Sequence, residues 1–140
     1  NVPGLDFILK LRPVTFNWDL DALERFHGRD QRQKDQEEPP AMKKARREKQ
    51  QKVYTGFVAQ QVEEAAGSIG YDFSGIRKPA NDQSTYNLSY AEFVVPLVKA
   101  AQEQQAIISR LEDQLEAQKE AIEKQQRQIE KLLEKMEPPQ

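Results

Sequence analysis

The chain has 140 residues, a net charge of −2 and no cysteine. This length suffices for one compact domain but not for two sizeable ones. The absence of cysteine excludes disulfides, thiol nucleophiles and thiolate metal sites, and the balanced charge gives no global indication of nucleic acid or of an acidic membrane surface.

The first eighteen residues predict a short helix followed by a strand. The helix begins near Pro3 and ends before Pro13, because the residue that precedes a proline avoids the α region. Its predicted inner face contains Leu5, Ile8 and Leu9. The strand alternates apolar and polar residues, and its buried face is expected to contain Val14, Phe16 and Trp18.

A charged insertion is predicted at residues 29–52, after a short helix that opens with a capping box at Asp21–Glu24 and stops at Gly28. The insertion contains nine basic and five acidic residues and almost no apolar residue. We expect it to be solvated, either disordered or loosely helical, and broken at Pro39-Pro40.

The middle of the chain predicts a second strand at residues 53–59, a helix at 60–66 and a loop at 67–84. We expect the second strand to pair with residues 14–18, so that the insertion enlarges a hairpin connection. A short strand follows at 85–88. The predicted core of this head contains Val14, Phe16, Trp18, Phe57, Tyr90 and Phe93.

The last third of the chain predicts one long helix. Ser89 and Glu92 have the spacing of a capping box at its start. Pro96 falls in the expected second turn, where it should kink the helix. The helical pattern then continues to about Met136, and Pro138-Pro139 closes it.

This helix carries a heptad repeat over six heptads, which is a strong coiled-coil signal. The predicted oligomer interface consists of its a and d positions: Val94, Leu97, Ala101, Gln104, Ile108, Leu111, Leu115, Gln118, Ile122, Gln125, Ile129, Leu132 and Met136. All seven a positions are apolar, and three of the six d positions are. A solvated single helix would show no such preference at a, so partner helices are expected, most simply copies of the same chain.

The heptads leave the number of strands open. Isoleucine at a with leucine at d favours dimers. Three further apolar residues flank the seam and widen it, which favours three or more strands: Ile107, Ala121 and Leu133. The glutamines at d need paired amides when they are buried, and such polar positions fix register and strand number.

Together these elements predict an α+β fold with two parts. Residues 1–89 form a small head of short antiparallel strands and short helices, with the insertion at 29–52. Residues 90–137 form a coiled-coil stalk helix, and a trimer is favoured over a dimer.

Three segments in this order resemble the C-terminal intramolecular chaperone domain of phage endosialidases and tail fibres: GLDFILKLRPVTFNW, YTGFVAQQVEEA and YNLSYAEFVVPLVKAAQEQQ. The resemblance covers about residues 4–18, 53–66 and 85–108, and the insertion at 29–52 is extra. It implies a bacterial or phage protein at a cell surface or on a virion. It also implies a trimer that aligns and helps fold an upstream fibre segment of the same polypeptide.

The resemblance further implies release by self-cleavage through a serine–lysine dyad in an S-D-x-R-x-K motif at the N-terminal edge. The serine attacks the peptide bond before it, and a lysine with a lowered pKa is the general base. No such motif occurs in this chain, which begins at Asn1 a few residues downstream of the expected place. We therefore expect no catalytic residue here and an inactive chain, while the parent protein is a candidate self-cleaving peptidase.

Other residues give weaker signals. The basic run Met42–Lys49 leaves an alternative hypothesis open: a generic coiled-coil adaptor that recruits a protein or nucleic acid through the insertion. No aromatic residue lies within this run to stack on bases, which weakens the nucleic-acid interpretation. His27 is the only histidine, and Asp72 and Asp82 lack calcium-loop spacing, so no metal or cofactor is expected. Gln60 either helps to position the cleavage strand, as the resemblance allows, or lies at the surface.

Overall fold

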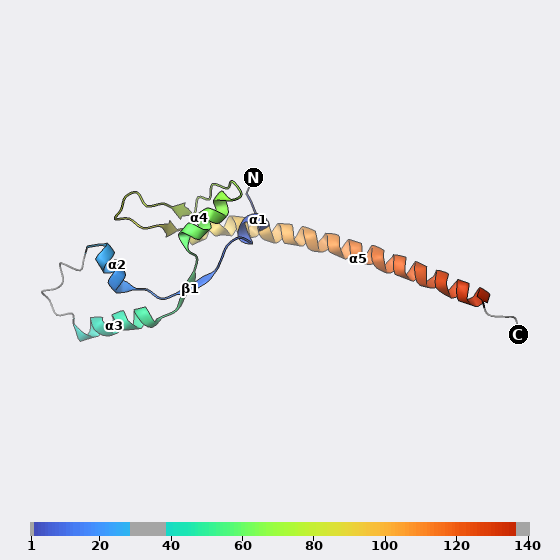
Figure 1. Ribbon diagram of the computed structural model, residues 1–140, viewed down its shortest axis with the longest axis horizontal. Coiled ribbons are helices and arrows are strands. Elements are labelled where there is room, and N and C mark those ends of the chain that lie inside the picture. Colours follow the sequence, from blue (N-terminus) through green and yellow to red (C-terminus); the bar gives the residue numbers. More distant parts are fainter. Residues whose placement is uncertain (1, 29–38, 137–140) are drawn as a thin grey trace.

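The computed structural model describes residues 2–28 and 39–136 (Figure 1). The elements in chain order are α1 (Leu5–Ile8), β1 (Val14–Phe16), α2 (Leu20–Phe26), α3 (Pro40–Gln51), β2 (Tyr54–Gly56), α4 (Ala59–Gly67), β3 (Ile76–Arg77), β4 (Asn87–Leu88), the 3-10 turn η1 (Tyr90–Phe93) and α5 (Val94–Met136). We call α5 the stalk, α2 and α3 the arm, and the remaining elements the head. The predicted α+β class is confirmed.

The first antiparallel pair forms as predicted, although both strands are shorter than expected. β1 pairs with β2 in the register Val14–Gly56, Thr15–Thr55 and Phe16–Tyr54. The arm connects these two strands, so the insertion does enlarge a hairpin connection. Within the described residues, a second pair joins Ile76 to Leu88 and Arg77 to Asn87. The sequence predicted loop for Ile76 and Arg77, because two residues are too few to show an alternating pattern.

The head core is built around Phe7, which is fully buried. The Phe7 ring lies 5.0 Å from the Phe73 ring and 5.2 Å from the Tyr71 ring, and Phe73 in turn lies 4.7 Å from Phe93. The inner face of α4 completes the core with Val62, Ala65 and Ala66. Offset and edge-on ring contacts of this kind add to the free energy gained from burial itself.

The predicted core was wrong in part. Phe93 is buried and Phe57 is partly buried, as expected. Phe16, Trp18 and Tyr90 are exposed by 36%, 39% and 53%. The pair of strands that carries Phe16 is a two-stranded ribbon beside the core, and nothing in the described chain covers its outer side.

The predicted inner face of the first helix also needs correction. Ile8 packs against the core, but Phe7 is its buried residue and Leu9 is 75% exposed. A helix of four residues shows too little periodicity for the sequence to identify its inner face.

Helix α1 is fixed to the base of the stalk by a close backbone approach. A β-carbon on Gly4 would lie 2.8 Å from the backbone nitrogen of Ala100 and 2.5 Å from Glu103 Oε2, so only glycine fits. The Leu5 backbone N–H donates to Glu103 Oε2 at 2.8 Å. The carboxylate thus lies at the N-terminus of α1, where the exposed backbone amides favour negative charge.

The arm contains the short helix that the sequence predicted and a second helix in the insertion, which agrees with the helical one of the two states expected there. Helix α2 begins at Leu20, because the Asp19 side chain accepts from the Ala22 backbone N–H at 2.8 Å. The capping box expected at Asp21–Glu24 is therefore not the cap. Helix α3 runs through the second half of the predicted insertion and begins at Pro40, a residue that suits the first helical position. Residues 29–38 of the insertion lie outside the described part.

Arg46 of α3 holds the two helices of the arm together. Its guanidinium donates to Glu24 at 2.7 and 2.8 Å and to Asp21 at 2.5 Å. The hydrogen bond from Arg46 holds the pKa of Asp21 below its usual value, and Gln50 adds to the effect. The pKa of Arg46 is raised by the same contacts, first of all by Glu24. The Arg46 and Glu24 side chains are partly buried, at 21% and 37% exposure, whereas Asp21 is 63% exposed, so water screens the pair with Asp21 more strongly than the pair with Glu24.

The start of the stalk differs from the prediction in two ways. Ser89 makes no side-chain cap, and Glu92 instead accepts from the Ser74 hydroxyl at 2.9 Å. The chain enters the stalk through the 3-10 turn η1, so α5 begins only at Val94. Pro96 therefore falls in the first α-helical turn, where its missing N–H costs no intrahelical hydrogen bond, rather than in the second turn.

Candidate assembly surface

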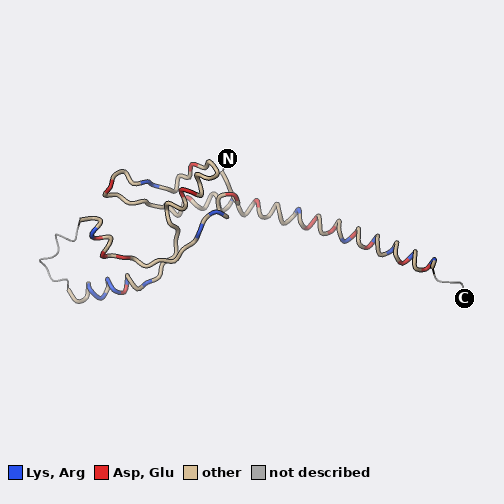
Figure 2. Tube along the Cα trace, viewed as in Figure 1, with Lys and Arg blue, Asp and Glu red and all other residues tan. Residues whose placement is uncertain are grey.

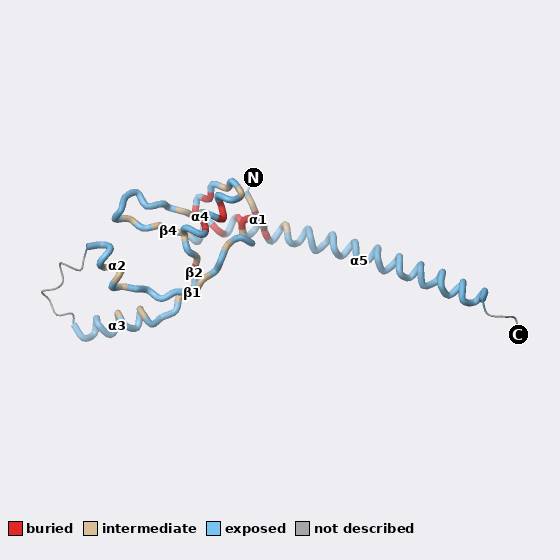
Figure 3. The backbone as a smooth tube through the Cα atoms, in the orientation of Figure 1, coloured by how far each residue is buried: buried red, intermediate tan, exposed pale blue. Residues whose placement is uncertain are grey.

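Beyond its first turns, the stalk projects away from the head (Figure 1). Its 43 residues span about 65 Å at 1.5 Å per residue. Only its first turns touch the head, and beyond Glu103 every described stalk residue is exposed (Figure 3). The stalk does not fold back to cover its own apolar stripe.

The thirteen predicted interface residues, which we call the seam, lie along one side of this free helix. All of them are exposed: Val94, Leu97, Ala101, Gln104, Ile108, Leu111, Leu115, Gln118, Ile122, Gln125, Ile129, Leu132 and Met136. Ile108, Leu115 and Ile129 are 47%, 53% and 51% exposed, so each apolar side chain keeps about half of its surface in water. Whether partner helices cover the seam is not tested by a single chain, and the interface stays a prediction.

The head docks on a side of the stalk that borders the seam. Pro96 and Ala100 are the buried stalk residues, and both face the head. At 100° per residue, Val94 lies roughly 120° from Ala100, but Leu97 and Gln104 lie only about 60° and 40° from it. Leu97 and Gln104 are exposed all the same, so docking of the head leaves these seam residues uncovered.

The distribution of apolar and charged residues around the stalk is typical of a helix that has one face covered. Ile107 and Leu133 beside the seam are 39% and 59% exposed, so the apolar stripe is wider than the a and d positions alone. Acidic and basic residues are interspersed along the stalk (Figure 2), and none of the thirteen seam residues is charged. Lys119 and Glu116 form one such pair at 3.9 Å. An outer face of this kind is solvated and supports the helix through short-range charge pairs.

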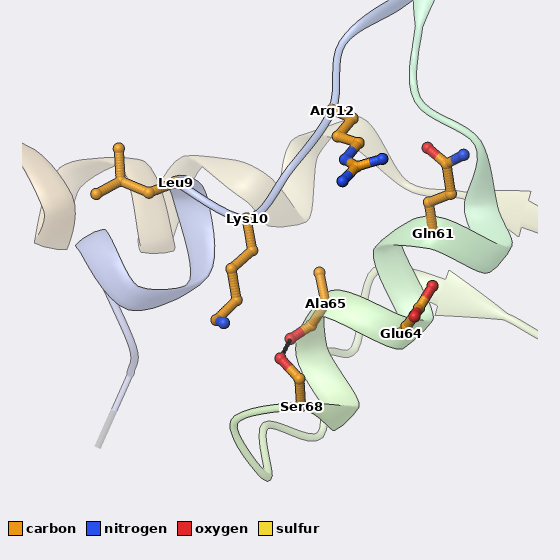
Figure 4. Close-up of a pocket in the computed structure, with 7 residues that line it drawn as sticks. All are labelled: Leu9, Lys10, Arg12, Gln61, Glu64, Ala65 and Ser68. Atoms are coloured by element: carbon orange, nitrogen blue, oxygen red, sulfur yellow. Dashed lines mark hydrogen bonds between the residues drawn. The ribbon is translucent and has the colours of Figure 1, made fainter.

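A shallow groove lies between α4 and the segment that follows α1 (Figure 4). Its volume is about 440 Å³, and it is lined by Leu9, Lys10, Arg12, Gln61, Glu64, Ala65 and Ser68. Ser68 donates its hydroxyl to the Ala65 carbonyl at 2.8 Å, and Figure 4 draws no hydrogen bond between Ser68 and Lys10. The groove thus contains a serine and a lysine but not the hydrogen-bonded pair that a nucleophile and its base require.

No group of three potential metal-ligating side chains occurs among residues 2–28 and 39–136. His27 lies at the end of α2, where its ring contacts Phe26. No described helix is both long enough and apolar enough to span a bilayer. Gln60 is exposed at the start of α4.

The comparison with protein families decides what kind of domain this is. The model of the chaperone of endosialidase family matches residues 2–71, which is half of the chain. The chain belongs to the chaperone of endosialidase family. The match begins before α1 and ends at Tyr71, so it covers the arm and most of the head, and the stalk lies beyond it. Comparisons with curated proteins and with solved structures found no match.

Membership of the chaperone of endosialidase family gives the domain a general role in folding. The family resemblance drawn from the three sequence segments is confirmed over the first two of them. Sequence reasoning missed the contact of Gly4 and Leu5 with Ala100 and Glu103. A glycine that follows a proline near a chain start has many uses, and no local pattern pairs it with a helix almost one hundred residues away.

Proposed function

We propose that this chain is an intramolecular chaperone that assembles three copies through the stalk and thereby aligns three upstream chains. The exposed seam is the observation that carries the proposal. Burial of half-exposed leucine and isoleucine side chains gives roughly 1 kcal/mol each, or on the order of 10 kcal/mol per chain over the apolar seam positions. That free energy is enough to drive the association of helices.

Alignment helps folding through effective concentration. A β-rich fibre forms by non-local pairing, which is slow because the ends of long loops must meet first. Three stalks that have already associated hold the three upstream chains close together and in the same register. The contact between α1 and the stalk supports this role, because it ties the N-terminal side of the head to the helix that assembles.

The test is refolding of the longer polypeptide that contains an upstream fibre segment. With the seam intact, dilution from denaturant should give soluble, assembled fibre. The double substitution Ile108→Lys and Leu111→Lys places charges on the seam and should lower that yield severalfold. An equal yield from both proteins would refute the chaperone role, since assembly would then not guide folding.

We further propose that the parent protein releases the domain by self-cleavage at its N-terminal edge. The family match supports this proposal, and the chain itself holds no S-D-x-R-x-K motif. Mass spectrometry of the longer polypeptide should find one cut just before a serine. A longer polypeptide that assembles fully and stays intact would exclude cleavage for this member while leaving the folding role in place.

The adaptor alternative has one observation in its favour. Lys43, Lys44, Arg47 and Lys49 of α3 are exposed and concentrate positive charge on the arm (Figure 2). Deletion of residues 29–52 separates the two functions. An adaptor would lose its partner and keep its assembly, whereas the chaperone function predicts that assembly and folding of the fibre survive the deletion.

A further inference from the structure

Three aromatic rings lie together on the ribbon of β1 and β2, outside the head core. Phe16 lies 5.6 Å from Trp18 and 5.7 Å from Tyr54, and Trp18 lies 6.4 Å from Tyr54. Phe16 and Trp18 are more than one third exposed. Exposure of large aromatic rings to water is unfavourable in free energy. A cluster of exposed rings therefore indicates an interaction site more often than isolated apolar residues do.

This cluster is continuous with the start of the stalk. The Tyr90 hydroxyl accepts from the Phe57 backbone N–H at 3.1 Å and lies directly over Gly56. A β-carbon on Gly56 would come within 2.6 Å of that hydroxyl and 3.2 Å of the Phe16 ring. The Tyr90 hydroxyl and the Phe16 ring therefore both lie next to the space that a side chain at position 56 would fill, and the glycine there lets them come close. We call the four rings of Phe16, Trp18, Tyr54 and Tyr90 the aromatic strip.

Tyr90 lies in η1, the turn through which the chain enters the stalk, four residues before Val94. It is 53% exposed. Val94 follows it at the first a position of the stalk and is 56% exposed. The exposed rings of the ribbon therefore lie next to η1, which joins the head to the start of the seam at Val94.

We propose that the aromatic strip is a second contact surface between copies of this chain, which extends the assembly from the stalk onto the head. The inference rests on the proposed function, because it takes a second copy as the occupant. Copies that associate through the seam in parallel bring the same end of each stalk together. The surface next to the seam at that end then faces the neighbouring copy.

The composition and size of the strip fit this occupant. The Lys52 ammonium lies over the Tyr54 ring at 5.2 Å from its centroid. Asn17 donates its amide to the carbonyls of Gln51 and Lys52, so these polar groups border the rings. The exposed rings present roughly 200–300 Å², against about 800 Å² per partner in a stable interface. The strip therefore extends an interface that the seam provides and does not replace it.

Trp18 is the only tryptophan, so its fluorescence reports on the strip in the unmodified full-length chain. The experiment measures acrylamide quenching and the emission maximum of Trp18, together with molar mass by light scattering, over a dilution series. Ile108→Lys supplies a dissociated reference, and Ala106→Lys, on the outer side of the same helical turn, is the matched control. Circular dichroism verifies that each protein is folded.

In the assembled wild-type chain and in Ala106→Lys, we expect quenching to fall severalfold relative to Ile108→Lys, with emission shifted to shorter wavelength. An assembled wild-type chain whose Trp18 is quenched as strongly as that of Ile108→Lys would overturn the inference and leave the proposed function standing. A wild-type chain that stays a single copy at all concentrations would overturn both. The two failures are therefore distinguishable.

Discussion

At the residue scale, Phe7 and Gly4 decide how the N-terminal segment lies on the rest of the molecule. Phe7 supplies the ring around which the core packs, and Gly4 allows the backbone to reach the stalk at Ala100. Helix α1, which follows Gly4 and contains Phe7, has only four residues, and isolated helices of that length do not persist in water. Both roles therefore depend on contacts outside this helix. The segment is held by its long-range contacts.

Replacement of Phe7 by alanine should lower the free energy of unfolding by about 3–5 kcal/mol, since it leaves a cavity between the rings of Tyr71 and Phe73. Chemical denaturation followed by circular dichroism measures the change. Leu9→Ala is the matched control in the same segment, and because Leu9 is 75% exposed, a change within about 0.5 kcal/mol is expected. Equal effects of the two substitutions would contradict the assignment of Phe7 as the core residue.

Gly4→Ala should displace α1 from the stalk and lower the free energy of unfolding by about 1–3 kcal/mol, because the added carbon meets the backbone of Ala100. Gly67→Ala is the control, since nothing lies within 4 Å of its added carbon. That change should be neutral or slightly stabilising at the end of α4. Amide exchange of Leu5, faster in Gly4→Ala alone, would locate the effect at its hydrogen bond to Glu103.

At the element scale, the sequence predicted the elements whose pattern is long and missed those that depend on distant contacts. The pairing of β1 with β2 and the helix α4 followed from local alternation and from Gly67. The stalk followed from seven apolar a positions. β3 has only two residues and so leaves no recognisable pattern. The exposure of Phe16 and Trp18 could not be predicted either, because their alternation with polar residues is the same in a covered strand and in an uncovered ribbon.

The arm should open in acid, because its pairing depends on ionised carboxylates. The pKa of Asp21 is lowered in the folded chain, so its contribution to stability is complete above its unfolded value of 3.8 and is lost as the pH falls through its folded pKa. Protection of the α3 amides from exchange, relative to the intrinsic rate at each pH, should therefore fall below about pH 4, while that of the head core changes less.

Arg46→Gln should remove this acid dependence and accelerate exchange in α3 already at neutral pH. Lys44→Gln on the same helix is the control, because its pair with Glu48 is exposed and long at 3.9 Å. An arm whose exchange at neutral pH is the same in wild type and in Arg46→Gln would show that other contacts hold α2 to α3.

The hairpin of β3 and β4 is held to α4 by an ion pair and a hydrogen bond, which together we call the clamp. Lys78 pairs with Glu63 of α4, and the Tyr86 hydroxyl donates to Glu63 at 2.8 Å. The pKa of Glu63 is lowered, first by the hydrogen bond from Lys78 and then by that from Tyr86, so this clamp also weakens as the pH falls below 4.5. It fixes the loop at 78–86 to the head.

At the scale of the whole molecule, the head contains the folded core, and the stalk carries the surface that we propose for assembly. The head buries its core and docks on one side of the stalk, while the seam stays exposed along the side that borders it. The seam could be predicted from the sequence because heptad spacing is local, and its role as an interface stays a prediction. The side on which the head docks could not be identified, because Pro96 and Ala100 become buried only through contacts with residues far away in the chain.

The molar mass of the purified chain, measured by light scattering at micromolar concentration, tests the central claim most directly. The wild-type chain and Ala106→Lys should each have three times the mass of a single chain. Ile108→Lys should have the mass of one, because a charge at this position opposes burial of the seam. A wild-type chain with the mass of a single copy would contradict the account, since its seam would then remain in water without a partner.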